Sequence, residues 1–150
     1  GSIIPLFKAQ RQLGVVTVTD ERMTRFWITF EEGVGFVIKC LELMCGGEVF
    51  VPKIPSTKII DLVKVIAPEC KVKFIGIRPG EKIHESLLTE DESRHSLAFK
   101  DFFIIEPEFQ WWKRKKWKAG RPLPVGFRYT SDKNDMWLTK DALRKMTVGI

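Results

Sequence analysis

The chain has 150 residues, the length of one domain, and 44% of them are hydrophobic, which excludes an intrinsically disordered protein. No apolar run approaches the roughly 20 residues that cross a bilayer. The first residues are too soon interrupted to form a signal peptide, so we expect no membrane span and a cytoplasmic protein. The three cysteines form no Cys-x-x-Cys pair and the two histidines stand alone, so we expect no metal site.

The net charge of +6 belongs to one segment of the chain. Residues 111–121 (WWKRKKWKAGR) hold six basic residues and no acidic one. Without them the chain has 19 basic and 19 acidic residues. The basic character is therefore a property of this segment and not of the whole domain.

The start of the chain predicts a helix followed by two extended segments. Residues 5–13 form the helix, because Pro5 suits a first helical position and Gly14 ends it. The β-branched run at residues 15–19 (VVTVT) predicts a strand. After a polar turn, residues 25–30 (RFWITF) predict a second one.

Two longer helices are predicted next. Thr29 caps the first, acidic residues favour its first turn, and a Gly-Gly pair ends it. Residues Pro55, Ser56 and Thr57 cap the second, which ends before Pro68.

A strand follows each of these helices. Residues 48–51 (EVFV) are a largely apolar run, which is typical of a strand buried on both faces. Residues 70–77 (CKVKFIGI) alternate as a strand does. The order helix, strand, helix, strand indicates an α/β fold.

The remainder of the chain is richer in loops. A helical turn is predicted at residues 84–89, a small hairpin at residues 96–105, and loops over residues 105–136. Thr139 caps a last helix. We therefore expect one α/β domain over residues 1–150, with short strands, about three to four helices and an incomplete sheet.

The motif Arg78-Pro79-Gly80-Glu81-Lys82 is the first candidate binding site. Arg78 follows directly on a predicted strand, and the Pro-Gly pair turns the chain at once. Ligands of α/β folds bind at the carboxyl ends of strands, and a guanidinium group holds a phosphate with two parallel hydrogen bonds. Glu81 is within reach of the two ribose hydroxyls. The alternative is a surface turn closed by a salt bridge.

Arg25 is the second candidate. Arg22 and Arg25 flank a turn in front of an aromatic-rich segment, so Arg25 is a candidate to bind the same anion as Arg78. In the alternative interpretation, Arg25 pairs with a local acid, Asp20 or Glu21.

Four strings in this order resemble one family. They are residues 20–28 (DERMTRFWI), 46–56 (GGEVFVPKIPS), 67–71 (APECK) and 76–85 (GIRPGEKIHE). The chain is similar to the inverting UDP-N-acetylglucosamine 4,6-dehydratases, which are extended short-chain dehydrogenases, and specifically to their C-terminal, substrate-binding part. The resemblance also includes residues 2–7 and 127–138.

The resemblance implies a binding site for a UDP-sugar such as UDP-N-acetylglucosamine. Arg25 and Arg78 would bind its diphosphate, and Glu81 would hydrogen-bond the uridine ribose. The uracil and sugar pocket would be lined by Ile3, Ile4, Pro5, Thr17 and Val18.

The same resemblance implies that the redox half of the enzyme is missing. In the intact family, the N-terminal half supplies a Gly-rich turn for NADP and a catalytic Tyr-x-x-x-Lys pair. This sequence has no G-x-G-x-x-G turn after a strand. We therefore expect no cofactor site and no catalytic residue in this chain, which would be the UDP-sugar-binding portion of a dehydratase and inactive alone.

The strand at residues 48–51 would extend the parallel sheet of that missing half. Alone it exposes an edge, which is a recognised hazard for aggregation. We expect compensation by a homodimer, by a separate Rossmann half or by rearrangement.

Two other features have competing interpretations. Tyr129 and Lys133 fit the Tyr-x-x-x-Lys pattern, but the turn-forming residues between and after them argue against the helix that a catalytic pair requires. The aromatic and basic segment 111–121 suits an alternative function as a nucleic-acid-binding or interaction module, or as a membrane-surface contact. Its ordinary interpretation is a charged loop whose tryptophans pack onto the domain. For His84 and His95 we expect structural hydrogen bonds.

Overall fold

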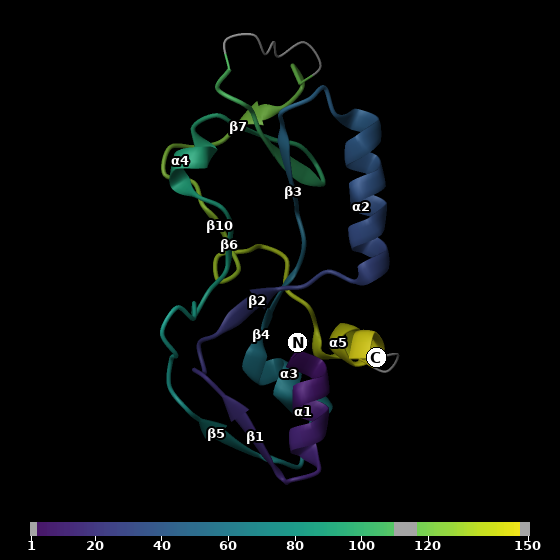
Figure 1. The fold of residues 1–150 in the computed structure, drawn as a ribbon, viewed down its shortest axis with the longest axis vertical. Coiled ribbons are helices and arrows are strands. Elements are labelled where there is room, and N and C mark those ends of the chain that lie inside the picture. The colour runs from purple at the N-terminus through teal and green to yellow at the C-terminus, as the bar shows by residue number, and fades with distance from the viewer. Residues whose placement is uncertain (1–2, 110–116, 148–150) are drawn as a thin grey trace. The chain divides into compact units, whose positions relative to one another are not determined.

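The computed structural model describes residues 3–109 and 117–147, and it confirms the α/β class (Figure 1). The chain divides into two compact units. Unit 1 consists of the described residues within 1–27, 55–85 and 131–150, and unit 2 of those within 28–54 and 86–130. No helix of the described ranges is long and apolar enough to cross a membrane.

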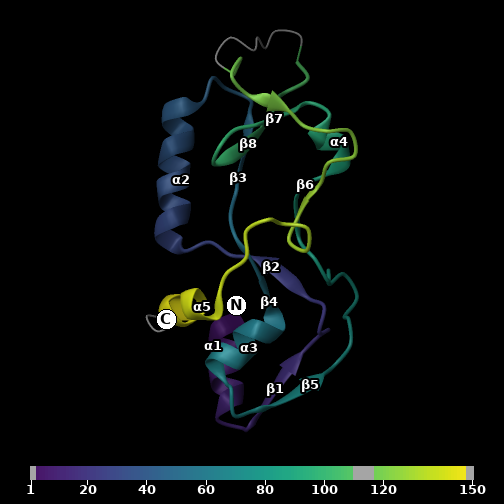
Figure 2. The ribbon, with the colours of Figure 1, turned by 180° about the vertical axis from the view of Figure 1, so that it is seen from behind.

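Unit 1 is built on two parallel strands with helices packed against them (Figure 2). β1 (Val15–Val18) pairs in parallel with β5 (Lys71–Phe74), so that Val15 lies opposite Lys71 and Val18 opposite Phe74. The helices are α1 (Ile3–Arg11), α3 (Ile59–Ile66) and α5 (Lys140–Thr147). A parallel pair requires a crossover connection between its strands, and here that connection contains α3.

The core of unit 1 joins residues from all of these helices and from β1. Its buried side chains are apolar and almost fully excluded from solvent: Ile4, Phe7, Val16, Val18, Met23, Ile59, Leu62, Val63, Ile66, Ala67 and Leu143.

The predicted cap of α3 is wrong. Ser56 and Thr57 belong to β4 (Ser56–Lys58), which pairs antiparallel with β2 (Thr24–Phe26). β4 runs directly into α3, and the side chain of the N-cap residue Lys58 makes no capping bond. The Ser56 hydroxyl instead accepts a hydrogen bond of 3.0 Å from Asn134 Nδ2. The Ser56 hydroxyl is therefore used in a long-range hydrogen bond and does not cap α3.

Unit 2 contains an antiparallel sheet in the order β3-β8-β7-β9. Its strands are β3 (Val49–Pro52), β7 (Ser96–Ala98), β8 (Phe102–Ile105) and β9 (Arg121–Pro122). The hairpin predicted at residues 96–105 is confirmed. The strand predicted to be buried on both faces, β3, is an edge strand in which only Val51 is buried. Of its other apolar residues, Val49 is exposed and Phe50 packs against Phe102 and Trp117.

The prediction of a helical turn at residues 84–89 is wrong, because the helical turn comes directly after these residues. These residues contain β6 (Ser86–Leu88), which pairs with β10 (Tyr129–Thr130). Thr89 then caps the single-turn helix α4 (Glu90–Ser93) through a reciprocal bond with Glu92. With α4, the described residues contain five helices, whereas the sequence indicated three to four.

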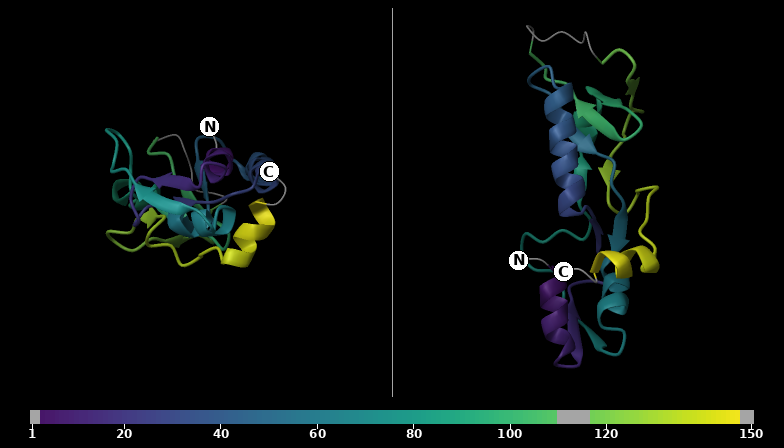
Figure 3. Two further views of the ribbon diagram at one scale, coloured as in Figure 1. Left: turned by 90° about the horizontal axis from the view of Figure 1, so that it is seen from below. Right: turned by 90° about the vertical axis from the view of Figure 1, so that its right-hand side faces the viewer.

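The longest helix of unit 2, α2 (Phe30–Leu43), begins at the predicted cap. The Thr29 hydroxyl accepts the Glu32 N–H, and the Glu32 carboxylate accepts the Thr29 N–H. Figure 3 shows this helix running alongside the sheet of unit 2.

Thr29→Ala should remove this capping box. We expect a loss of about 1 kcal/mol in the local stability of the first turn of α2. Amide hydrogen exchange at residues 30–33 measures it. Thr29→Ser keeps the hydroxyl and should retain most of the protection; equal loss in both variants would mean that the cap contributes nothing.

Candidate functional site

The carboxyl ends of β1 and β5 lie side by side and carry polar residues. The pairing of the two strands continues past their ends: Ile75 N–H donates to the Val18 carbonyl at 3.0 Å, and Gly76 N–H to the Thr19 carbonyl at 3.1 Å. The Thr19 hydroxyl and the turn that begins at Arg78 are therefore held together. This is the edge at which open α/β sheets bind their ligands.

The motif that begins at Arg78 forms a tight turn. Glu81 N–H donates to the Arg78 carbonyl at 3.0 Å, with Pro79 at the second position and Gly80 at the third with φ of +80°. A type II turn needs a positive φ at that third position, which glycine supplies at little cost. The turn places Arg78 and Glu81 on the same short segment.

Glu81 is fixed by two hydrogen bonds. Its Oε1 accepts the Thr19 hydroxyl at 2.9 Å, and its Oε2 accepts the Arg78 N–H at 3.2 Å. These bonds, the one from Thr19 first, lower the pKa of Glu81. The interaction is complete above the ordinary carboxyl pKa and is lost as the pH falls through the lowered one. At neutral pH the group is a negatively charged acceptor of fixed orientation.

Arg25 holds the segment that follows the turn. Its Nη1 donates to the Thr24 carbonyl at 2.7 Å and the Ile83 carbonyl at 3.0 Å, and its Nη2 to the Lys82 carbonyl at 2.9 Å. Its Nε lies 3.3 Å from Glu85 Oε1. A guanidinium has five N–H donors, so about one remains for a ligand. Arg25 is chiefly a positioning residue for residues 82–85.

Of the partners predicted for Arg25, neither Asp20 nor Glu21 is used. Asp20 instead forms an ion pair with Arg22, with 2.8 Å between Oδ2 and Nη2. Hydrogen bonds from the side chain and then the backbone of Arg22 lower the pKa of Asp20 to about 2. The local acid was assigned to the wrong arginine because Arg22 lies on the turn itself, next to Asp20.

Arg25, Arg78 and Glu81 line one cavity of about 150 Å³ in unit 1. Of the predicted apolar and hydroxyl residues, Ile3, Thr17 and Val18 line it as well. Ile4 is only 2% exposed and belongs to the core, and Pro5 is exposed; neither is in the lining. Drug-sized ligand pockets measure about 300–1,000 Å³, so this cavity accommodates a part of such a molecule.

Sequence reasoning missed several residues of the lining. These are Leu6, Phe7, Thr19, Met23, Ile59 and Ile75. Thr19 and Ile75 had a usable signal, since each directly follows a strand of the parallel pair. Leu6, Phe7 and Ile59 had none, because core and pocket residues have the same periodicity in α1 and α3.

Gln10 fixes the Thr17 wall of the cavity. Its Nε2 donates to the Thr17 hydroxyl at 2.8 Å, and its Oε1 accepts the Thr17 N–H at 3.0 Å. The Gln10 amide thus makes hydrogen bonds at the edge of β1 that a neighbouring strand would otherwise make, and it attaches α1 to β1.

His84 has the structural role expected for it. Its Nδ1 lies 2.8 Å from the Thr24 hydroxyl, which lies 2.7 Å from the Ser131 hydroxyl. Ser131 in turn accepts the Glu85 N–H at 2.9 Å and donates its own N–H to the Glu85 carbonyl at 2.9 Å. This network fixes residues 84–85 next to the segment that Arg25 holds. In unit 2, His95 Nδ1 lies 3.1 Å from Glu108 Oε1.

Tyr129 lies on a strand and not on the helix that a catalytic Tyr-x-x-x-Lys pair requires. Its hydroxyl donates to the Ile54 carbonyl and accepts the Ile54 N–H, each at 2.9 Å. The hydroxyl is therefore engaged in structure.

A nicotinamide dinucleotide does not fit the described residues. Its pyrophosphate needs a glycine-rich turn between a strand and the N-terminus of a helix. In the described part of the chain, β4 enters α3 without a glycine, and α2 and α5 begin after Thr29 and Thr139.

Most of the basic segment, residues 110–116, lies outside the described residues, but Trp117 is described. It is 4% exposed and packs edge-on against Phe50 and Phe99, with ring centroids 5.7 and 5.6 Å away. Its Nε1 donates to Glu48 Oε1 at 2.9 Å. This tryptophan is part of the core of unit 2 and is not exposed for stacking on a base.

The chain is similar to several known proteins. Residues 1–107 match the family described as "Polysaccharide biosynthesis protein". The chain is 40% identical, over 95% of its length, to a UDP-N-acetylglucosamine 4,6-dehydratase (inverting) of Campylobacter jejuni, of which it covers 46%. Over 101 residues it is 43% identical to the capsular polysaccharide biosynthesis protein CapD of Staphylococcus aureus, which corresponds to 61% of this chain and 17% of that protein.

The fold has a solved counterpart. The X-ray structure of Pen from Bacillus thuringiensis superposes with a TM-score of 0.79 and 32% sequence identity, covering 99% of this chain and 44% of Pen. The chain thus spans less than half the length of these relatives.

Proposed function

Since the chain belongs to the polysaccharide biosynthesis protein family, we propose that its unit 1 binds the nucleoside diphosphate of a UDP-sugar, as one portion of a nucleotide-sugar 4,6-dehydratase. The observation that carries this proposal is the joint placement of Arg78, Glu81 and Thr19 at the carboxyl ends of two parallel strands. A cation, a fixed anionic acceptor and a hydroxyl at one edge suit a diphosphate attached to a ribose.

Arg78 is the main phosphate ligand in this proposal. No described side chain or carbonyl accepts a hydrogen bond from its guanidinium, so its fork of donors is available for two parallel bonds to phosphate oxygens. Arg25 contributes at most its remaining Nη2 hydrogen. In this proposal, binding of the diphosphate depends on direct contact with Arg78 and on Arg25, which holds the conformation of residues 82–85.

Glu81 is the ribose ligand. Each of its oxygens already accepts one bond within the protein, and a carboxylate has about four acceptor sites. Two sites therefore remain for the 2′ and 3′ hydroxyls. The apolar wall formed by Ile3, Val18 and Ile75 suits the face of a base.

Chemistry on the sugar requires groups that these residues do not supply. In a 4,6-dehydratase, NADP bound elsewhere would carry the hydride. We propose that this chain contributes binding and orientation and that it is inactive alone. Incubation with NADP and UDP-N-acetylglucosamine should give no 4-keto-6-deoxy sugar; formation of that product by the purified chain would refute this part.

Arg78→Ala should weaken UDP binding by about 10-fold to 150-fold. Hydrogen bonds to charged groups contribute about 1.5–3 kcal/mol each, and every 1.4 kcal/mol is about tenfold in affinity. Isothermal titration calorimetry with UDP measures the loss.

Arg22→Ala is the matched control, because Arg22 pairs with Asp20 outside the cavity. Its affinity for UDP should equal that of the unaltered chain. The proposal is wrong if the unaltered chain fails to bind UDP, or if both arginine variants bind it equally.

A further inference from the structure

Four groups of unit 1 form an unbroken chain of hydrogen bonds beside the nucleotide site. Thr24 and Ser131 are buried, at 3% and 0% exposed, and His84 is partly buried. The Thr24 hydroxyl lies 2.8 Å from His84 Nδ1 and 2.7 Å from the Ser131 hydroxyl. The Glu85 N–H donates to Ser131 Oγ at 2.9 Å. The chain therefore runs from the Glu85 amide through two hydroxyl groups to an imidazole.

The number of hydrogens in this chain fixes its direction. The Glu85 N–H is a donor only, and each hydroxyl has one hydrogen to donate. If Ser131 donates to Thr24 and Thr24 donates to His84 Nδ1, every hydrogen of the chain has an acceptor. In the reverse direction Thr24 donates to Ser131, and the Ser131 hydrogen then has no acceptor among the described residues. A buried donor without an acceptor is costly, so the first direction is the stable one.

This direction determines the state of His84. Its Nδ1 can accept a hydrogen bond only in the neutral imidazole whose hydrogen is on Nε2. Protonation puts a hydrogen on both ring nitrogens. The bond from Thr24 would then have to reverse, and the buried Ser131 hydrogen would lose its acceptor.

The chain is continuous with the segment that follows the Arg78 turn. The Thr24 N–H donates to the Ile83 carbonyl at 3.0 Å, which also accepts a bond from Arg25 Nη1. The Ser131 N–H donates to the Glu85 carbonyl at 2.9 Å. Residues 83–85 are therefore held by β2 on one side and by Ser131 on the other.

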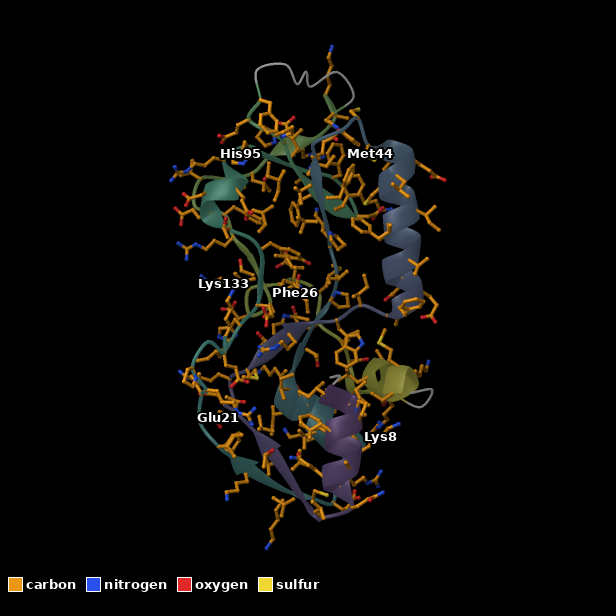
Figure 4. All side chains as sticks on the ribbon, in the orientation of Figure 1. Lys8, Glu21, Phe26, Met44, His95 and Lys133 are labelled. Atoms are coloured by element: carbon orange, nitrogen blue, oxygen red, sulfur yellow. The ribbon has the colours of Figure 1, made fainter. Side chains whose placement is uncertain are left out.

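Ser131 itself is on a segment that is well anchored. This segment lies outside residues 1–107, which match the family model, and Figure 4 labels Lys133, two residues further along it. Backbone bonds attach it to β4: the Ser56 N–H donates to the Met136 carbonyl at 2.8 Å, and the Leu138 N–H donates to the Ser56 carbonyl at 2.9 Å. The Ser131 hydroxyl is thus a fixed point for the residues that it bonds.

We propose that Ser131 and Thr24 are positioning residues of the nucleotide site, and that they act through a neutral His84 whose ring hydrogen is on Nε2. They hold residues 83–85 directly behind the turn that carries Arg78 and Glu81. Loss of the hydrogen-bond chain, by substitution or by protonation of His84, loosens this segment and weakens binding. The binding consequence rests on the proposed UDP-sugar site, whereas the state of the chain is testable without a ligand.

The charged groups around His84 do not replace this control. Asp20 is the acid whose charge interacts with His84. It would stabilise an imidazolium if it were unpaired, but it forms an ion pair with Arg22 at 2.8 Å. Hydrogen bonds from the side chain and backbone of Arg22 lower the pKa of Asp20 to about 2, so its charge is constant where histidine side chains titrate. Arg25 and Glu85 form an ion pair with each other at 3.3 Å.

Nitrogen-15 NMR of the free chain tests the direction of the hydrogen bonds. In mildly alkaline buffer, where histidine side chains are neutral, His84 Nδ1 should have the chemical shift of an acceptor nitrogen and Nε2 that of an N–H nitrogen. Thr24→Val removes the hydroxyl at nearly unchanged shape and should abolish this preference, whereas Thr24→Ser should retain it. A hydrogen on Nδ1 in the unaltered chain would overturn the proposal.

Hydrogen exchange tests the positioning role in the same ligand-free samples. Thr24→Val should accelerate exchange of the Glu85 amide by about 5-fold to 150-fold, although Thr24 makes no bond to that amide. Thr57→Val is the matched control, because Thr57 is also buried and its hydroxyl bonds the Lys58 carbonyl outside the chain. Equal exchange rates in the two variants would contradict the positioning role.

A pH profile of UDP-N-acetylglucosamine binding tests the link to the ligand. Affinity should fall by about 5-fold to 150-fold as His84 becomes protonated, which its nitrogen-15 shifts report. The pKa of Glu81 is lowered by bonds from Thr19 and Arg78, so this carboxylate stays charged in that range. His84→Asn offers an amide oxygen in place of Nδ1 and has no proton to gain, so its affinity should not change with pH.

The outcomes of this profile are distinct. Acid sensitivity that persists in His84→Asn, or an affinity that stays constant while His84 is protonated, would overturn the inference. If the unaltered chain binds no UDP-sugar at any pH, the proposed function is wrong, and so is the binding consequence drawn here. The NMR and exchange results would then still decide whether Ser131 and Thr24 hold residues 83–85.

Discussion

Leu62→Ala is expected to lower the free energy of unfolding of unit 1 by about 2–5 kcal/mol. Leu62 is on α3, has no exposed surface and lies in the cluster that joins α1, α3, α5 and β1. Truncation removes buried methyl groups and leaves a cavity that these elements cannot close without moving. Urea-induced unfolding measures the loss in the free energy of unfolding, with hydrogen exchange at the β1 amides as the probe.

Leu13→Ala makes the same chemical change at a site that is 79% exposed, and we expect it to cost less than about 0.5 kcal/mol. A loss below about 1 kcal/mol for Leu62→Ala would contradict the assigned core. The position of β1 depends on this cluster, and Thr19 at its end bonds Glu81. The Leu62→Ala variant should therefore also bind UDP more weakly at denaturant concentrations that populate its unfolded state.

The sequence predicted those elements whose signals are local. The cap of α2, the helix after Thr139, the hairpin at residues 96–105 and the two strands that carry the pocket all follow from short patterns, and the structure confirms them. The resemblance to the dehydratase family is confirmed by the relatives as well.

Predictions failed where distant residues compete for one group. Ser56 was expected to cap α3, but its backbone hydrogen-bonds Met136 and Leu138, and its hydroxyl accepts a hydrogen bond from Asn134. Ile4 and Pro5 were placed in the pocket with Ile3 by the resemblance alone, but each residue along a helix turns the side chain by about 100°. No pattern in a single sequence specifies which of two neighbours faces a cavity formed by a strand 70 residues away.

Arg25 and Arg78 line the same cavity, but the described bonds of Arg25 hold the chain beside it. Its bonds to the carbonyls of residues 24, 82 and 83 could not be inferred, because they depend on how the chain returns after the turn at Pro79 and Gly80.

Arg25→Lys should therefore disturb the site even though it keeps the charge. An ammonium group has three donors on a flexible stem and cannot reproduce the planar fork that reaches three carbonyl groups and a carboxylate together. We expect a loss of about 1–3 kcal/mol in the local stability of residues 82–85. Hydrogen exchange of the Glu85 and Ser131 amides without UDP should accelerate by about 5-fold to 150-fold, and UDP binding should weaken with it.

The exchange measurement separates positioning from direct contact. If Arg25 served only as a phosphate ligand, the substitution would weaken UDP binding and leave exchange in the free protein unchanged. If it holds the segment, exchange rises before any ligand is added, because the Glu85 and Ser131 amides bond within the same network. Arg22→Lys, at a residue whose described side-chain hydrogen bonds go to Asp20, should alter neither quantity. The diphosphate affinity of unit 1 would then depend on two arginines by different physical routes, Arg78 through contact and Arg25 through the conformation of the chain beside it.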